Sequence, residues 1–182
     1  MGGGMIEAGL FLLNALVGFL CIALLLRFYM QAFRVSFANQ LGAFVVQLTN
    51  GLVKPLRKVL PGLFGLDLAS LLPAWLLQVF LVFVALALRG GLEMLPTERL
   101  LGIVLWQGTL GILRLSIYLL IGALLLQAVL SWVNPYSPIG QPVAQLTRPF
   151  LAPIRRFVPP IANIDLSPLI AILLAQVVLI FL

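Results

Sequence analysis

The residues best placed to do chemistry are two aspartates, Asp67 and Asp165, each of which follows a pair of basic residues along the chain. Two carboxylates can act together as a general acid and a general base. The sequence, however, supplies no histidine and only one cysteine, Cys21, to accompany them. We therefore expect each aspartate to cap the helix that follows it or to form an ion pair with an arginine. The sequence predicts no catalytic residue, no metal ligand and no cofactor.

Two glutamines, Gln78 and Gln176, lie within apolar runs, each roughly 16 Å along a helix from its aspartate. An amide at that depth of a bilayer needs a partner, so we expect these side chains to form hydrogen bonds between helices. The alternative is a pore lined by the two amides. No carboxylate lies at a comparable depth, which argues against a cation pathway or a proton relay.

Most of the remaining charge is basic and lies in two segments between apolar runs. The cations concerned are Lys54, Arg57, Lys58, Arg148, Arg155 and Arg156. Lys and Arg hold loops in the cytoplasm, which accounts for a net charge of +6 without a nucleic-acid partner. The same cations could also bind anionic lipid headgroups, at ~1 kcal/mol each, or dock an acidic partner. Because the first basic position of each pair is arginine in both segments, we predict that it needs a planar guanidinium, whereas the second needs only charge.

The composition indicates that lipid is the solvent for much of this chain. Its 182 residues are 63% hydrophobic and 9% charged, against roughly 45–50% and 25% in soluble domains. The runs 8–26 and 68–88 contain no acidic residue, and each is long enough to cross a bilayer, which takes ~20 residues. Backbone polar groups in lipid must bond within the protein, and alternation typical of strands is absent, so helices are the expected spans.

The chain repeats itself at an offset of 98 residues, without a gap across the basic segment. The matched pairs include Pro55 and Pro153, Arg57 and Arg155, Lys58 and Arg156, Pro61 and Pro159, Asp67 and Asp165, and Gln78 and Gln176. We predict an all-α membrane protein with about four transmembrane helices in two repeats, each a helix, a basic amphipathic loop and a helix. The first repeat is residues 1–98, with spans at about 8–33 and 67–88. The second is residues 99–182, with spans at about 115–133 and 165–182.

Each basic segment also contains apolar residues at helical spacing. They are Phe37, Leu41, Phe44, Val45, Leu48 and Leu52 in the first segment, and Ile139, Val143, Leu146 and Phe150 in the second. This pattern predicts a helix that lies on the cytoplasmic leaflet. The apolar run 100–133 is too long for an upright span at ~1.5 Å per residue. We therefore expect a break at Arg114, with 100–113 at the outer interface and 115–133 across the membrane.

The distribution of Lys and Arg sets the expected orientation. Both basic segments carry an excess of cations, whereas the N-terminus carries only Glu7 and the linker at 89–99 is balanced. Both segments are therefore expected in the cytoplasm and both termini outside. The two units then share one orientation, which makes a parallel repeat rather than an inverted one.

The doubled pattern of Pro, Leu or Ile, Arg, and Lys or Arg, followed by Asp-Leu, resembles the YggT family, called YlmG in Gram-positive bacteria. The resemblance covers nearly the whole chain and includes Ser131-Trp132 before the second basic segment. The stretches that begin at Asp67 and Asp165 look like the family's paired motifs, and its basic positions match Arg57, Lys58, Arg155 and Arg156. The resemblance implies a bacterial inner-membrane protein for which no enzymatic activity is established. It also implies a loose association with assembly of membrane complexes or cofactors, with division and envelope organisation, and with osmotic tolerance.

We therefore expect a non-enzymatic, multi-pass inner-membrane protein with periplasmic termini. The favoured role is that of a scaffold or assembly factor that acts through its basic cytoplasmic face. Its expected partners are the lipid bilayer with its anionic headgroups and either another membrane protein or a second copy of the chain. The alternative is a channel or transport component linked to osmotic stress.

Overall fold

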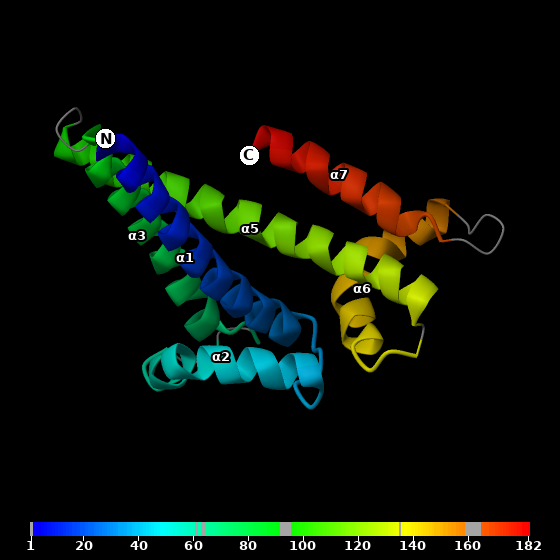
Figure 1. Cartoon of the computed structure of the whole chain (residues 1–182). Coiled ribbons are helices and arrows are strands. Elements are labelled where there is room, and N and C mark those ends of the chain that lie inside the picture. The colour runs from blue at the N-terminus through cyan, green and yellow to red at the C-terminus, as the bar shows by residue number, and fades with distance from the viewer. Residues whose placement is uncertain (1, 61, 63–64, 92–95, 135, 159–164) are drawn as a thin grey trace.

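The chain is helical along most of its length (Figure 1). The computed structural model describes residues 2–60, 62, 65–91, 96–134, 136–158 and 165–182. Its helices within these ranges are α1 (Gly2–Ala32), α2 (Gln40–Arg57), α3 (Leu68–Leu88), α5 (Thr97–Val133), α6 (Gly140–Phe157) and α7 (Ser167–Phe181). The prediction of an all-α chain is confirmed.

Three of these helices, α1, α3 and α5, are long and apolar enough to cross a membrane by length and composition. The 15-residue helix α7 is also apolar but shorter, at ~22 Å. The chain is therefore consistent with a membrane protein, and α7 as a fourth span stays a prediction.

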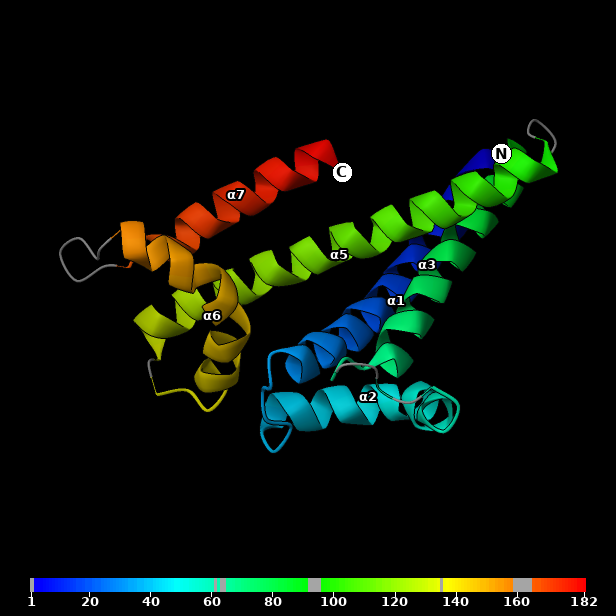
Figure 2. The same cartoon turned by 180° about the vertical axis from the view of Figure 1, so that it is seen from behind.

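In the first half, α1 and α3 pack side by side, and α2 lies across the ends of both (Figures 1 and 2). Their shared core is built from small and aliphatic residues, namely Leu24, Leu25, Val53, Ala69, Ala74 and Ile112. Helix α5 approaches α3 closely at Gly108, where an added Cβ would lie 2.6 Å from Cγ2 of Val79. Glycine is required there because a side chain would force the two helices apart.

Helix α2 confirms the helix predicted within the first basic segment. The Asn39 side chain caps its start by accepting the N–H of Gly42 at 2.8 Å. Residues spaced three or four apart face the rest of the protein and are buried: Gly42, Val45, Thr49 and Val53. The apolar residues Phe44, Leu48 and Leu52 lie on an exposed side of the same helix. The predicted apolar face is therefore divided between a buried contact and an open surface.

Helix α6 forms in the second basic segment although Pro149 and Pro153 lie inside it. Each proline removes a backbone N–H and crowds the carbonyl one turn earlier, which bends a helix. Figure 2 shows α6 changing direction along its length. Its inner side still buries Val143, Leu146 and Leu151.

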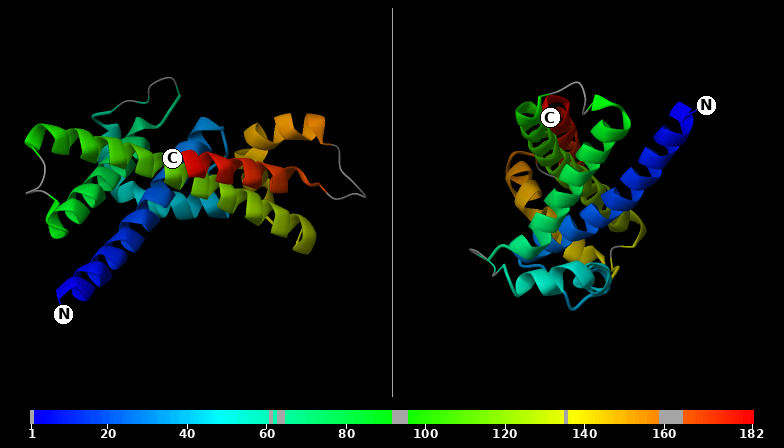
Figure 3. Two further views of the ribbon diagram at one scale, coloured as in Figure 1. Left: turned by 90° about the horizontal axis from the view of Figure 1, so that it is seen from above. Right: turned by 90° about the vertical axis from the view of Figure 1, so that its left-hand side faces the viewer.

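Helix α5 is one unbroken helix of 37 residues, so the predicted break at Arg114 is wrong. The Arg114 guanidinium donates a hydrogen bond to the backbone carbonyl oxygen of Leu182, beside the end of α7. Since this carbonyl gives the guanidinium a hydrogen-bond acceptor within the protein, the helix can continue through Arg114. Helix α5 contacts α3 in the first half and α6 and α7 in the second, and Figure 3 shows α7 lying along it.

Candidate functional site

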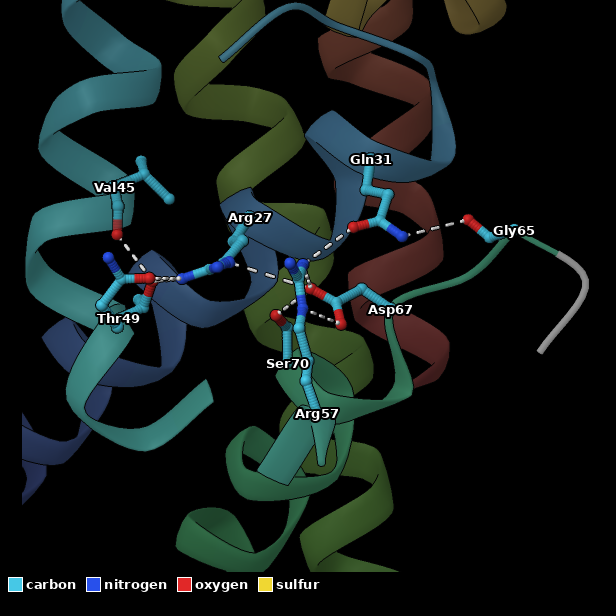
Figure 4. Close-up of polar contacts among 9 residues, drawn as sticks. Arg27, Gln31, Val45, Thr49, Arg57, Gly65, Asp67 and Ser70 are labelled. Atoms are coloured by element: carbon cyan, nitrogen blue, oxygen red, sulfur yellow. Dashed lines mark hydrogen bonds and ion pairs between the residues drawn. The ribbon is translucent and has the colours of Figure 1, made fainter. Parts of the chain in front are cut away.

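A cluster of buried charge lies where α1, α2 and α3 meet (Figure 4). Asp67 stands at the N-cap of α3, Arg57 is the last residue of α2, and Arg27 lies near the end of α1. Asp67 is 2% exposed and Arg27 is 4% exposed. One carboxylate is thus shared by two arginines from two other helices.

Arg57 holds the carboxylate with two nitrogens. Its Nη2 lies 2.5 Å from Oδ2 of Asp67, and its Nε lies 3.3 Å from Oδ1. Nη2 also donates to Oε1 of Gln31 at 3.0 Å. This two-pronged geometry is the strong form of an arginine–carboxylate contact and fixes the angle between the partners. The end of α2 is therefore tied both to the start of α3 and to α1.

Arg27 joins α1 to α2. Its Nη1 donates to Oγ1 of Thr49 at 2.7 Å and to Oδ1 of Asn50 at 3.1 Å. Its Nε lies 3.8 Å from Oδ2 of Asp67, which is an ion pair without a hydrogen bond. A charged group so deeply buried is stable only when its partners are in place. The packing of α2 against α1 at Arg27 therefore depends on the negative charge of Asp67.

Asp67 is held as an anion by its neighbours. Ser70 donates its hydroxyl to Oδ2 at 2.6 Å. Burial by itself would raise the pKa of the Asp67 carboxyl, but hydrogen bonds from Arg57 and Ser70 and the charges of Arg57 and Arg27 hold that pKa below its usual range. The Asp67 side chain makes no capping bond to the backbone of α3. Of the two roles expected for Asp67, the structure shows the ion pair.

The second half contains a simpler and more exposed pair. Arg155 places Nε at 2.9 Å and Nη2 at 2.7 Å from Oδ2 of Asp165, with both side chains more than a third exposed. Oδ1 of Asp165 accepts the backbone N–H of Ser167 at 3.0 Å, at the start of α7. Burial raises the pKa of Asp165, but the bonds from Ser167 and Arg155 outweigh it and lower that pKa. Asp165 therefore pairs with Arg155 and also accepts one backbone N–H at the start of α7, where Leu166 is the N-cap residue.

The halves differ in the counterpart of Arg27. When Gln31 is aligned with Gln127, the position of Arg27 falls on Ala123. Thr147, the counterpart of Thr49, donates its hydroxyl to Oε1 of Gln127 instead of receiving a guanidinium. The second half thus keeps the polar contact between its first two helices but lacks the buried cation.

The two predicted intramembrane glutamines lie in different surroundings. Gln78 is buried, and its Nε2 donates to Sγ of Cys21 at 3.7 Å. Its Oε1 faces Gly111 of α5, where an added Cβ would be only 2.7 Å away. Gln176 is exposed on α7 and has no hydrogen-bond partner among the described residues. The structure does not bring the two amides together.

The other predicted cations remain at the surface. Lys54, Lys58, Arg148 and Arg156 are exposed, and none of them forms an ion pair within the described part of the chain. Over that same part, no three His, Cys, Asp or Glu side chains gather where they could hold a metal ion. Roles for these cations at a headgroup or a partner stay predictions.

Arg27 is the important residue that the sequence reasoning missed. It lies inside the predicted span at about 8–33, and the sequence predicts no role for it. The signal was present, since a charged residue inside an apolar span is costly and marks a site with a partner. Its partners Thr49, Asn50 and Asp67 lie far along the chain, so spacing alone did not reveal them.

We expect Asp67→Asn to destabilise the protein strongly, because it leaves Arg27 buried without its anion. Removing one partner of a buried ion pair costs ~3–5 kcal/mol. The free energy of unfolding in detergent, followed by circular dichroism in a denaturant titration, measures the loss. Asp165→Asn is the matched control, and its exposed pair predicts a loss of only ~0.2–1 kcal/mol.

The same measurement has a defined pH dependence. The pKa of Asp67 is lower in the folded protein than in the unfolded chain, where it is about 3.9. Asp67 therefore makes its full contribution to the free energy of unfolding above that unfolded pKa. The contribution is lost as the pH falls through the pKa of the folded protein. Asp67→Asn should remove this part of the acid sensitivity. Equal losses for the two asparagine variants would show that the buried cluster adds nothing beyond an exposed pair.

A second prediction concerns the arginine positions. Arg57→Lys should cost ~1.5–3 kcal/mol, because a single ammonium cannot hold both carboxylate oxygens and Gln31 together. Arg155→Lys should cost less, because its partner Asp165 is more than a third exposed whereas Asp67 is buried. Lys58→Arg and Arg156→Lys serve as controls and should leave stability and accumulation in the membrane unchanged. If all four variants behaved alike, these residues would be topology charges only.

Comparisons with known proteins agree with the resemblance noted in the sequence. The family model described as CCB3/YggT matches residues 6–88 and 106–182. The chain is 36% identical over 169 residues to "Uncharacterized protein YggT" of Escherichia coli K12, which covers 92% of this chain and 85% of that protein. It is 36% identical over 163 residues to "Uncharacterized protein in proC 3'region" of Vibrio alginolyticus, covering 88% and 85% of the two chains.

A plant relative is similar over a shorter stretch. "YlmG homolog protein 2, chloroplastic" of Arabidopsis thaliana is 34% identical over 90 residues, which is 49% of this chain and 34% of that protein. No solved structure matches the chain. The family match covers most of both halves, including the helices that carry Arg57, Asp67, Arg155 and Asp165. The chain belongs to the CCB3/YggT family.

Proposed function

We propose that this protein is a non-enzymatic scaffold or assembly factor of the bacterial inner membrane. In this proposal α1, α3, α5 and α7 cross the bilayer as two parallel repeats, and α2 and α6 lie on the cytoplasmic leaflet. The apolar lengths of α1, α3 and α5 support the spans. The basic residues at the ends of α2 and α6 support the cytoplasmic side for both.

The observation that carries the proposal is the way in which α2 is held. Arg27 and Arg57 fix both its middle and its end, and this fixing uses the acidic and guanidinium groups that could otherwise act on a substrate. The outer side of α2 is left open, with Phe44, Leu48 and Leu52 exposed. A helix anchored at two points, with an exposed apolar stripe next to the exposed Lys54 and Lys58, suits the docking of another membrane protein better than chemistry.

The proposed topology predicts that both termini are periplasmic. Alkaline phosphatase, which needs disulfides and therefore an oxidising compartment, should be active when fused after Leu182. The matched control is a fusion after Lys58, which should be inactive because α2 faces the cytoplasm. Activity of only the second fusion would reverse the proposed orientation.

The scaffold role predicts a protein neighbour at the exposed side of α2. A photo-reactive benzoylphenylalanine in place of Phe44 should give one discrete protein adduct in native membranes. The same residue in place of Trp106 is the control, because Trp106 is similarly exposed but lies on α5. The yield of the adduct at position 44 should also fall in the Asp67→Asn variant, because α2 loses part of its attachment to α1 and α3.

Two outcomes would contradict the scaffold role. Equal protein adducts from positions 44 and 106 would show that α2 has no privileged neighbour. Ion flux through the purified protein in liposomes, abolished by Gln78→Leu, would instead identify a channel.

A further inference from the structure

Two hollows of different chemistry lie side by side between the halves of the protein. The first is an apolar groove of about 390 Å³ formed by α1, α5, α6 and α7. Its walls include Leu26, Tyr29, Phe33, Leu120, Ala123 and Phe150. Ser116 also lines it, but the Ser116 hydroxyl is already bonded to the carbonyl of Ile112 at 2.8 Å. The groove therefore suits a hydrocarbon chain, because its lining offers few groups that need a hydrogen-bond partner.

The second hollow, of about 370 Å³, is polar and cationic. Arg34, Gln145 and Arg148 line it together with Phe33. Phe33 belongs to both hollows and packs edge to face on Phe150 of the groove, with ring centroids 5.9 Å apart. The cationic hollow therefore adjoins the apolar groove at Phe33.

The two arginines of this hollow are available for a ligand. Neither Arg34 nor Arg148 forms an ion pair within the described residues, whereas Arg57 and Arg155 are engaged by aspartates. Two guanidinium groups and an amide match a phosphate, which accepts several hydrogen bonds at once.

The backbone at Arg34 fixes where its side chain leaves the end of α1. Its φ angle is +56°, in the left-handed region that favours glycine. A side chain there costs roughly 1–2 kcal/mol. The N–H of Val35 donates to the carbonyl of Met30 at 2.7 Å, so this conformation belongs to the turn that ends α1 and holds Arg34 at the edge of the hollow.

We infer that the paired hollows bind one anionic phospholipid, with its phosphate on Arg34 and Arg148 and an acyl chain in the groove. Each hollow has the size of an ordinary small-molecule pocket, ~300–1,000 Å³. Basic pockets between membrane helices are known to take anionic headgroups. The lipid joins α1 of the first half to α6 and α7 of the second. This site is separate from the exposed stripe of α2, so the lipid site can be tested independently of the scaffold role.

The experiment uses the full-length protein, delipidated in detergent and mixed with dioleoyl phosphatidylglycerol or dioleoyl phosphatidylcholine. Native mass spectrometry counts the lipid that each protein molecule retains. The unaltered protein should prefer phosphatidylglycerol. Arg34→Gln combined with Arg148→Gln should weaken retention of phosphatidylglycerol by about thirtyfold, the change expected for two cations at an anionic surface. Retention of phosphatidylcholine should fall less, because its phosphate is accompanied by a choline cation, which the two arginines repel.

Lys58 and Arg156 provide the competing location for the headgroup. They are exposed cations of the same two segments and line neither hollow. Lys58→Gln combined with Arg156→Gln changes the net charge equally, and an equal loss of phosphatidylglycerol would overturn the proposed site. If the double arginine variant fails to fold, Arg148→Gln alone, on the surface of α6, tests the same contact.

The acyl groove is tested by Ala123→Phe, whose ring would occupy the space of the chain. Retention of both lipids should fall, since both carry the same acyl chains. Val129→Phe adds the same ring at an exposed position of α5 and is the matched control. Unchanged retention in the Ala123→Phe variant would also overturn the proposal.

Discussion

The negative charge of a carboxylate that is buried away from water must be balanced by nearby positive charge. In the first half of this protein, the contacts between three helices meet this requirement. Asp67 is nearly inaccessible, and its charge is balanced by guanidinium groups from α1 and α2. Each arginine in turn fixes a polar side chain of another segment, Thr49 in one case and Gln31 in the other. Because water does not reach Asp67 and Arg27 to replace lost partners, these contacts support one another. Asp67 is therefore the anion through which α2 is attached to both α1 and α3.

The two halves have the same order of helices, but the ion pairs that link their helices differ in burial. The Arg155–Asp165 pair is open to solvent, and its half has an alanine where the first half has a buried arginine. The first half is therefore held by buried charge contacts as well as apolar packing, whereas apolar residues of α5, α6 and α7 form the core of the second half. That second half also borders the apolar groove. The two halves thus differ in how many buried charges hold their helices together.

The local sequence pattern was enough to predict most of the helices. It was not enough to predict the charge contacts between residues far apart in the chain. Helical spacing of apolar residues revealed α2, and the doubled basic motif placed Arg57 and Asp67 at one junction. Arg27 was missed because its partners are distant along the chain, and periodicity carries no information about such contacts. The continuity of α5 was missed for the same reason. Arg114 looked like an interfacial residue until α7 supplied a carbonyl for it.

The unequal lengths of α5 and α7 have a consequence for the surrounding lipid. An unbroken helix of 37 residues is ~55 Å long, nearly twice a hydrocarbon core of ~30 Å, whereas 15 residues supply only ~22 Å. The two helices lie along each other (Figure 3). A bilayer that takes in both must let the long one lean far from the normal while thinning around the short one. The protein would then mark a patch of locally compressed membrane, and bilayer thickness becomes a variable that governs where it resides.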